Sequence, residues 1–115
     1  MTMKRSILLA LCVTASVQAP AQQPPSEATV ARSLAATCAN CHGTNGQARG
    51  EMKPLAGMSA AKIIATLADF RSGAQPGTIM PQIAKGYTDE QIRLIANHMA
   101  AQPAAKYMAA QPAAK

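Results

Sequence analysis

Residues 38–42 read CANCH and bring together two of the three cysteines and one of the two histidines of this 115-residue chain. Three kinds of chemistry use such a cluster: a redox dithiol, half of a metal site, or a covalent anchor for haem. The sequence around the five residues distinguishes among the three.

A redox dithiol of this spacing usually accompanies a βαβ pattern, which the sequence lacks. A zinc site needs about four ligands, and beyond Cys38, Cys41 and His42 the only other imidazole is that of His98. Haem attachment uses every member of the motif, because two thiols at this spacing add to the two vinyl groups of one porphyrin and the following histidine reaches the iron. The sequence therefore predicts one covalent haem c, with thioethers at Cys38 and Cys41 and with His42 as an axial iron ligand.

The second axial position of such a haem needs a ligand of its own. Met99 falls on the apolar stripe of a predicted helix, where core filling is the usual role of methionine. Met80 stands in GTIMPQ, a segment expected to be irregular and able to cross the open haem face, and Pro81 restricts the backbone beside it. We expect Met80 to be the second axial ligand, chosen from six candidates: Met52, Met58, Met80, Met99, Met108 and His98. Histidine and methionine together fill both axial positions and raise the reduction potential, which suits one-electron transfer.

A ligating histidine is normally held by a partner at its other ring nitrogen. Pro54, twelve residues after His42 in KPLAG, is the expected source of a carbonyl that orients His42. The same proline is also compatible with a simple loop-forming role.

The first residues indicate export. Lys4 and Arg5 precede an apolar run over residues 7–17, and Ala19 and Ala21 offer cleavage sites, which is typical of a signal peptide over residues 1–21. The run is short for a permanent anchor, so we expect a periplasmic protein with no stable membrane insertion. An uncleaved anchor is the alternative.

Three helices are expected in the remainder. Ser26, Ser59 and Thr88 are candidate N-caps, and Thr88 forms a capping box with Gln91. Apolar residues recur at helical spacing after each cap, while glycine- and proline-rich loops cover residues 43–57 and 74–86. The predicted class is all-α, with a domain over residues 22–102 and a flexible tail over 103–115, in which MAAQPAAK occurs for the second time.

Composition agrees with a large cofactor and with a protein partner. The chain has three aromatic residues and no tryptophan, so a small domain gains from the apolar volume that a buried haem supplies. Loss of Lys4 and Arg5 with the signal peptide would reduce the formal net charge from +6 to +4. This charge suits an acidic partner or an anionic surface, and it is equally compatible with charges that only keep the protein soluble. Nucleic acid is not expected, because the basic residues are scattered and lack stacking aromatics.

The stretches SLAATCANCHGTNG, PLAG and TIMPQIAKGYTDEQI together resemble class I cytochromes c, over roughly residues 33–100. FRSG and IAKGYT are similar to the haem subunits of flavocytochrome c sulfide dehydrogenases. The resemblance implies a small class I cytochrome c-like fold, with three main helices wrapped around one covalently attached haem and with the first and last helices crossing. It also implies the same site residues: Cys38, Cys41, His42, Met80 and Pro54. At the crossing this chain offers only aliphatic side chains, where such proteins often carry a glycine and an aromatic residue.

The leading functional prediction is an exported monohaem cytochrome that is not itself an enzyme. It would accept single electrons from the flavoprotein subunit of a sulfide dehydrogenase and pass them to another electron carrier or terminal acceptor, with Lys85 able to help dock an acidic partner. The alternative is a free diffusible periplasmic carrier that forms transient, salt-sensitive complexes. A haem sensor requires an open sixth position, which Met80 argues against.

Overall fold

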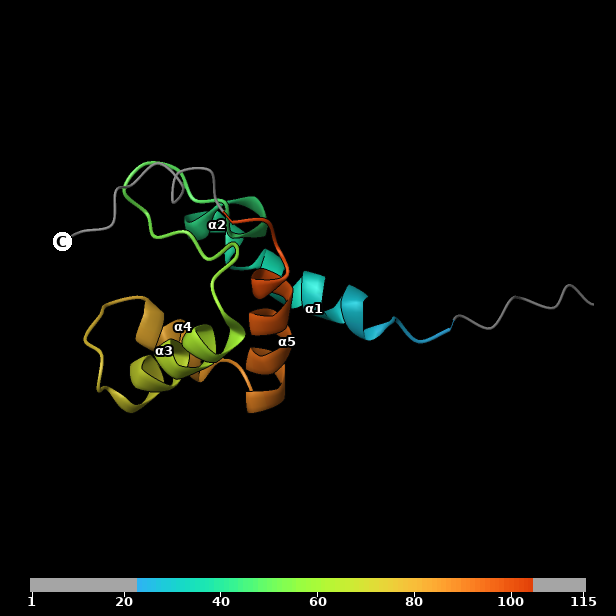
Figure 1. Cartoon of the computed structure of the whole chain (residues 1–115). Helices are drawn as coiled ribbons and strands as arrows, with labels where there is room; N and C mark the ends of the chain where they lie inside the picture. The colour runs from blue at the N-terminus through green and yellow to red at the C-terminus, as the bar shows by residue number, and fades with distance from the viewer. Residues whose placement is uncertain (1–22, 105–115) are drawn as a thin grey trace, which may run out of the picture.

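The computed structural model describes residues 23–104, and this part of the chain contains helices and loops but no strand. Figure 1 shows three longer helices with shorter helical segments between them. Their bounds are α1 Glu27–Ala36, α2 Ala39–His42, η1 Thr44–Gly46, α3 Ala60–Ser72, α4 Met80–Lys85 and α5 Asp89–Ala100. The predicted all-α class, with three main helices, is confirmed.

The caps expected from the sequence begin the three longer helices. The Ser26 hydroxyl accepts a hydrogen bond from the Thr29 backbone N–H, and Ser59 caps α3 in the same way. At α5, the Gln91 side chain accepts from the Thr88 N–H at 2.9 Å while the Thr88 hydroxyl accepts from the Gln91 N–H at 3.2 Å. Each cap satisfies backbone donors that the helix itself leaves without partners.

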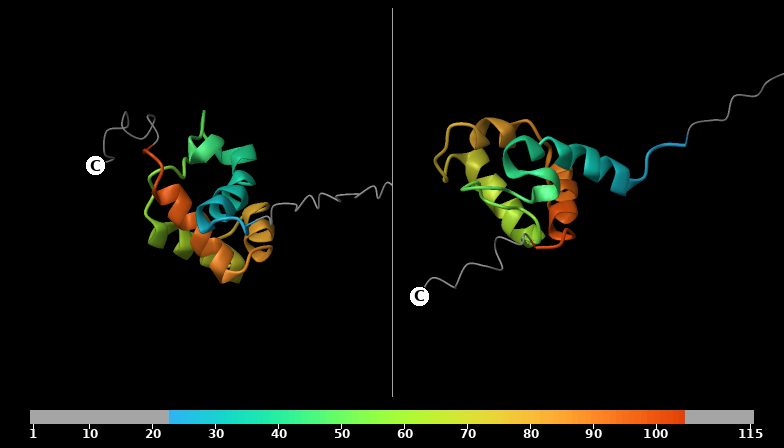
Figure 2. Two further views of the ribbon diagram at one scale, coloured as in Figure 1. Left: turned by 90° about the vertical axis from the view of Figure 1, so that its right-hand side faces the viewer. Right: turned by 90° about the horizontal axis from the view of Figure 1, so that it is seen from above.

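Helices α1 and α5 cross, as the views in Figure 2 show. Alanines lie where the two helices contact each other: Ala35 of α1 is 3% exposed and Ala96 of α5 is 0% exposed. The larger Val30 and Leu34 of α1 are only partly buried. Small side chains let two helix backbones come close together. They also leave a small cavity of about 100 Å³ beside the crossing, in keeping with its lack of an aromatic side chain.

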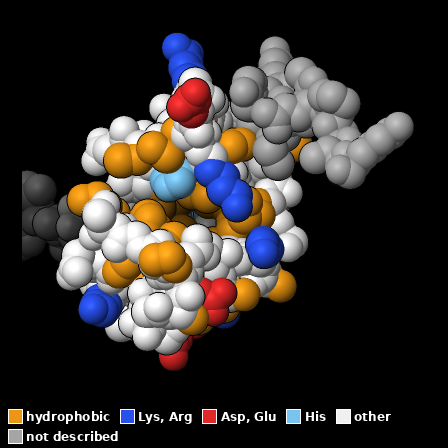
Figure 3. Space-filling model, turned by 90° about the vertical axis from the view of Figure 1, so that its left-hand side faces the viewer, with side chains coloured by type: hydrophobic (Ala, Val, Ile, Leu, Met, Phe, Trp, Pro, Cys, Tyr) orange, Lys and Arg blue, Asp and Glu red, His pale blue; other side chains and the backbone are white. Residues whose placement is uncertain are grey.

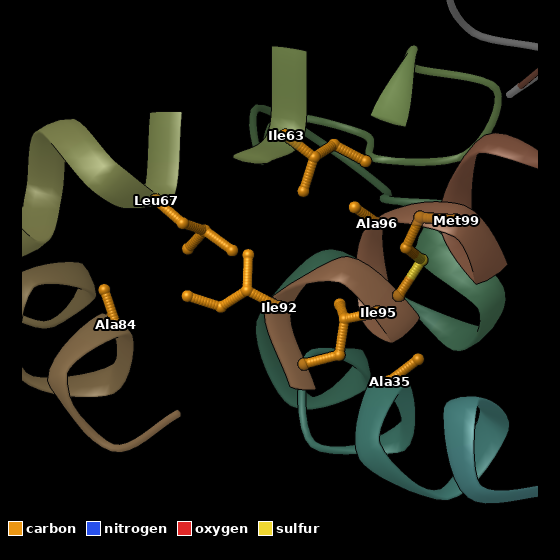
Figure 4. Close-up of a cluster of buried hydrophobic side chains, with 8 residues drawn as sticks. All are labelled: Ala35, Ile63, Leu67, Ala84, Ile92, Ile95, Ala96 and Met99. Carbon is orange, nitrogen blue, oxygen red and sulfur yellow. The ribbon is translucent and has the colours of Figure 1, made fainter. Parts of the chain in front are cut away.

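One cluster of buried side chains joins α1, α3, α4 and α5 (Figure 4). Met99 is its largest fully buried side chain, which confirms the core-filling role expected of it. The members of the cluster are Ala35, Ile63, Leu67, Ala84, Ile92, Ile95, Ala96 and Met99.

The segment expected to be irregular between α3 and α5 contains the short helix α4. Met80 is its first residue and Pro81 its second. A proline in the first helical turn costs no hydrogen bond, because the N–H it lacks would have no partner within the helix. The loop expectation was therefore wrong for residues 80–85, which form a helix with Pro81 in its first turn.

No helix among residues 23–104 is long and apolar enough to cross a membrane. The predicted signal peptide over residues 1–21 and most of the predicted tail lie outside the described residues. The first two residues of that tail are described: the Gln47 side chain donates to the carbonyl of Pro103 at 2.7 Å, and Ala104 lies against Gly57.

Candidate haem site

The CANCH motif forms a single helical turn at the end of α1. The His42 N–H donates to the Cys38 carbonyl at 2.9 Å, and the Cys41 N–H approaches the same oxygen at 3.3 Å. Positions three and four apart on a helix share a face, so both sulfur atoms and the imidazole extend from one side of the turn. The two thiols are free; Cys41 is exposed, and burial raises the pKa of the half-buried Cys38 thiol.

A backbone carbonyl holds the imidazole of His42 at its Nδ1 atom. This atom lies 2.7 Å from the carbonyl oxygen of Lys53. A carbonyl can only accept, so this bond requires the proton on Nδ1 and leaves the lone pair of Nε2 available. This is the tautomer and orientation that a metal-ligating histidine needs.

The carbonyl that holds His42 is one residue earlier than expected. The sequence pointed to Pro54, whereas the oxygen in contact belongs to Lys53, and Pro54 itself is buried directly after it. Hydrogen bonds just after Pro54 orient this loop. The N–H groups of Leu55 and Ala56 both donate to the Gly46 carbonyl, at 3.0 and 3.1 Å. These two bonds determine which peptide faces the imidazole.

Gly46 is a structural requirement of this loop that the sequence analysis did not single out. Its φ is +74°, and a Cβ there would lie 2.7 Å from the Ala56 nitrogen and 3.0 Å from the Met99 sulfur. Any side chain would push the loop away from the core and move the carbonyl that holds His42. The only sequence signal was a glycine four residues after the motif histidine.

The site has two walls. The motif turn α2 and the loop after it form one wall, and α3 and α4 form the other, which carries Met80. Helix α2 packs against α1 and η1, whereas α4 packs against α3. In Figure 1, α2 lies at the top of the molecule and α3 and α4 at the lower left. Met80 is half-buried and contacts the edge of the core. The structure therefore brings Cys38, Cys41 and His42 together and holds Met80 on a separate element.

The family described as "Cytochrome C oxidase, cbb3-type, subunit III" matches residues 25–99. The chain belongs to the c-type cytochromes. This c-type cytochrome is 39% identical over 79 residues to the cytochrome subunit of sulfide dehydrogenase from Chlorobaculum tepidum, over 69% of this chain and 71% of that one. It is 40% identical over 74 residues to cytochrome c-553 of Helicobacter pylori, over 63% and 77% of the two chains.

A solved structure has a similar fold. Cytochrome c4 of Acidithiobacillus ferrooxidans matches this c-type cytochrome with a TM-score of 0.55 and 30% identity, over 69% of this chain and 56% of that chain. The chain thus spans just over half of that protein. Sequence and fold agree that this is an electron-transfer protein whose cofactor is covalently bound haem c.

The apolar surroundings fit such a group. Figure 3 shows the face of the molecule that lies on the left-hand side in Figure 1. On this face, hydrophobic side chains surround a hollow that has a histidine side chain at its edge. Around the buried core of this cytochrome, several apolar side chains from both walls are only partly shielded, including Cys38, Leu55, Met58 and Met80. A large apolar cofactor would cover them. Residues 23–104 contain no cluster of three or more His, Cys, Asp or Glu side chains able to hold a metal ion.

His98 lies near the end of α5, beside a small cavity that Ala39 of the motif also lines. Its backbone carbonyl accepts a hydrogen bond from the Gln102 side chain at 2.9 Å, and it lines the small cavity beside the α1–α5 crossing. The side chain of His98 is partly buried, and Arg32 and Met99 line the same cavity. These are the surroundings expected of a residue at the end of a helix.

Proposed function

We propose that this cytochrome c holds one haem through thioethers at Cys38 and Cys41, with His42 and Met80 as the axial ligands of its iron. The observation that carries the proposal is the bond from His42 Nδ1 to the Lys53 carbonyl, beside two free thiols on the same helical turn. It leaves Nε2 facing away from the loop as a metal ligand with a fixed tautomer.

When bound, haem c supplies an iron centre that changes oxidation state by one electron. The work of the chain is to hold both ligands in position. The Lys53 carbonyl fixes the plane of the imidazole, and the partly buried side chains of Leu55 and Met58 exclude water from that side. Met80, at the start of a short helix anchored by the fully buried Ala84, is the ligand from the other wall. With both positions filled, electron transfer is favoured over binding of small ligands.

The ligand set is tested by absorption spectra of the haem-loaded protein, oxidised and reduced. We expect reduced c-type bands and, in the oxidised protein, the weak near-infrared band of methionine sulfur on ferric haem. Met80→Ala should abolish that band, whereas Met58→Ala, which truncates another half-buried methionine, should keep it. A wild-type protein without the sulfur band, or one that binds carbon monoxide readily when reduced, would contradict Met80 ligation and favour a sensor.

We further propose that the protein is exported and receives its electrons from a sulfide-oxidising flavoprotein. The support is its similarity to a protein named as the cytochrome subunit of sulfide dehydrogenase, together with the signal-peptide pattern over residues 1–21. The mature protein should then be found in the periplasm without its first 19 to 21 residues, about 2 kDa lighter at ~110 Da per residue.

Native purification tests the partner. A haem subunit should leave the first column together with a larger flavin-containing chain, and the complex should survive a rise in salt to 0.5 M. A free diffusible carrier, the function that similarity to cytochrome c-553 would favour, should elute alone and interact with its partners only at low ionic strength. Deletion of the gene should slow sulfide oxidation in the first case; an unchanged rate would argue for the second.

A further inference from the structure

Two stretches of the sequence, FRSG at residues 70–73 and IAKGYT at residues 83–88, meet in space although neither belongs to the site described above. The guanidinium of Arg71, at the end of α3, donates to the carboxylate of Asp89 at 2.6 Å and to the backbone carbonyl of Tyr87 at 2.9 Å. Arg71 is only partly exposed. Its two bonds hold the backbone of Tyr87 in the turn between α4 and α5.

The other end of Tyr87 is held as well. Its hydroxyl oxygen lies 2.5 Å from the hydroxyl oxygen of Thr37. The Thr37 hydroxyl donates its single proton to the Leu34 carbonyl at 2.9 Å, so the proton between the two hydroxyls must come from Tyr87. Tyr87 thus donates to Thr37, the residue immediately before Cys38.

This bond joins the two walls of the haem site. Thr37 ends α1 and leads directly into the CANCH turn. Tyr87 follows α4 after one residue, and the Gly86 N–H donates back to the Ile83 carbonyl at 3.0 Å, so the turn continues rigidly from the helix that begins with Met80. The separation of residues 37 and 87 along the chain is 50. A hydrogen bond between them therefore constrains the tertiary arrangement rather than a local turn.

We propose that Tyr87 is a positioning residue for the sixth ligand of the iron. Clamped by Arg71 at its carbonyl and by Thr37 at its hydroxyl, it sets where α4 and Met80 lie relative to Cys38. The proposal rests on Met80 being that ligand. Loss of the hydroxyl lets the α4 wall relax away from the motif, and the methionine then leaves the iron more often.

Competition by imidazole measures this release. Imidazole binds ferric iron only when the methionine is displaced, so its apparent affinity increases with the fraction of protein in which Met80 is detached. A hydrogen bond of ordinary strength corresponds to about a fivefold change in such an equilibrium. Tyr87→Phe, which removes only the hydroxyl, should raise the apparent imidazole affinity about fivefold. It should also lower the reduction potential, because methionine ligation raises it.

Thr37 supplies the partner variants. Thr37→Val should reproduce the effect of Tyr87→Phe, Thr37→Ser should retain wild-type affinity, and the double variant Tyr87→Phe with Thr37→Val should show no further increase, as expected when two groups share one interaction. Thr66→Val is the matched control. The Thr66 hydroxyl also donates to a backbone carbonyl, that of Lys62 at 2.8 Å, but within α3 alone; its loss should affect thermal unfolding without changing imidazole affinity.

The outcomes separate this inference from the proposed function. A wild-type protein that lacks the sulfur band refutes Met80 ligation and, with it, both proposals. A wild-type protein that has the band, combined with equal imidazole affinities for wild type and Tyr87→Phe, overturns the role of Tyr87 and leaves the ligand set intact. If Tyr87→Phe fails to mature, an affinity of Thr37→Val equal to that of Thr37→Ser overturns the role in the same way.

Discussion

The α1–α5 crossing and the walls beside it use the same kinds of side chain but shield them to different degrees. At the crossing, Ala35, Ala96 and Met99 are at most 3% exposed. At the walls, Leu55, Met58 and Met80 remain half-buried at the edge of the same core. Protein atoms fill the crossing apart from the small cavity beside it, whereas the walls need a large apolar group to finish their packing. Stability and cofactor binding are therefore expected to respond to different residues.

The largest effect should follow from removing the covalent anchors. In Cys38→Ala with Cys41→Ala, we expect no haem to remain attached after denaturing electrophoresis and the reduced c-type bands to be absent. The melting temperature followed by circular dichroism should also fall, because the half-buried side chains of both walls lose their covering. The single variants, each with one possible thioether, are the controls. Haem that stays attached to the double variant would show that its anchor lies elsewhere.

A large effect on stability, with none on ligation, should come from the crossing. Met99→Ala deletes the largest fully buried side chain and should lower the free energy of unfolding by about 2–5 kcal/mol. The sulfur–iron band should be unchanged at temperatures where the variant is folded. Met52→Ala, at a position that is 43% exposed, should change the free energy by less than about 0.5 kcal/mol. Denaturant titrations measure both, and a lost band in Met99→Ala would break the separation between the two regions.

Much of the crossing could be predicted from the sequence, because its signals are local. A serine or threonine before an apolar repeat identifies a cap wherever the helix later packs, and all three predicted caps are present. The inner face of α1 was less accessible to such reasoning. Val30 and Leu34 lie one turn apart on a common face of α1 but are only partly buried, whereas the smaller Ala31 and Ala35 are buried. Small side chains allow the two backbones to approach most closely.

The walls depend on long-range contacts that no local pattern contains. The peptide that faces His42 is that of Lys53 rather than Pro54, since the bonds from Leu55 and Ala56 to Gly46 orient the loop. The motif itself could be recognised from residue types and spacing alone. Its supports could not, because they join residues eleven positions apart at His42 and Lys53 and fifty apart at Thr37 and Tyr87.

The smallest effect is expected at the surface of the crossing. Arg93 donates to Glu90 one turn away in α5, with the closest nitrogen and oxygen atoms 2.5 Å apart, and this hydrogen bond lowers the pKa of Glu90 from its ordinary value of 4.5. A carboxylate whose pKa is lowered by folding stabilises the protein above its ordinary pKa, and that stabilisation disappears as the pH falls through the lowered value.

Glu90→Gln should therefore lower the melting temperature slightly at pH 7, and the difference from wild type should shrink towards zero as the pH falls from 4.5 through the lowered pKa of Glu90. The side chains of Arg93 and Glu90 are 43% and 64% exposed, so added salt should also reduce the difference at pH 7. Glu51→Gln, at an exposed loop position outside the ion pairs found among residues 23–104, is the matched control. A difference that stays the same throughout an acid titration of the melting temperature would mean that Glu90 acts through packing rather than charge. The stability of the crossing would then depend on the shapes of its side chains at the surface, as it does in its alanine-lined interior.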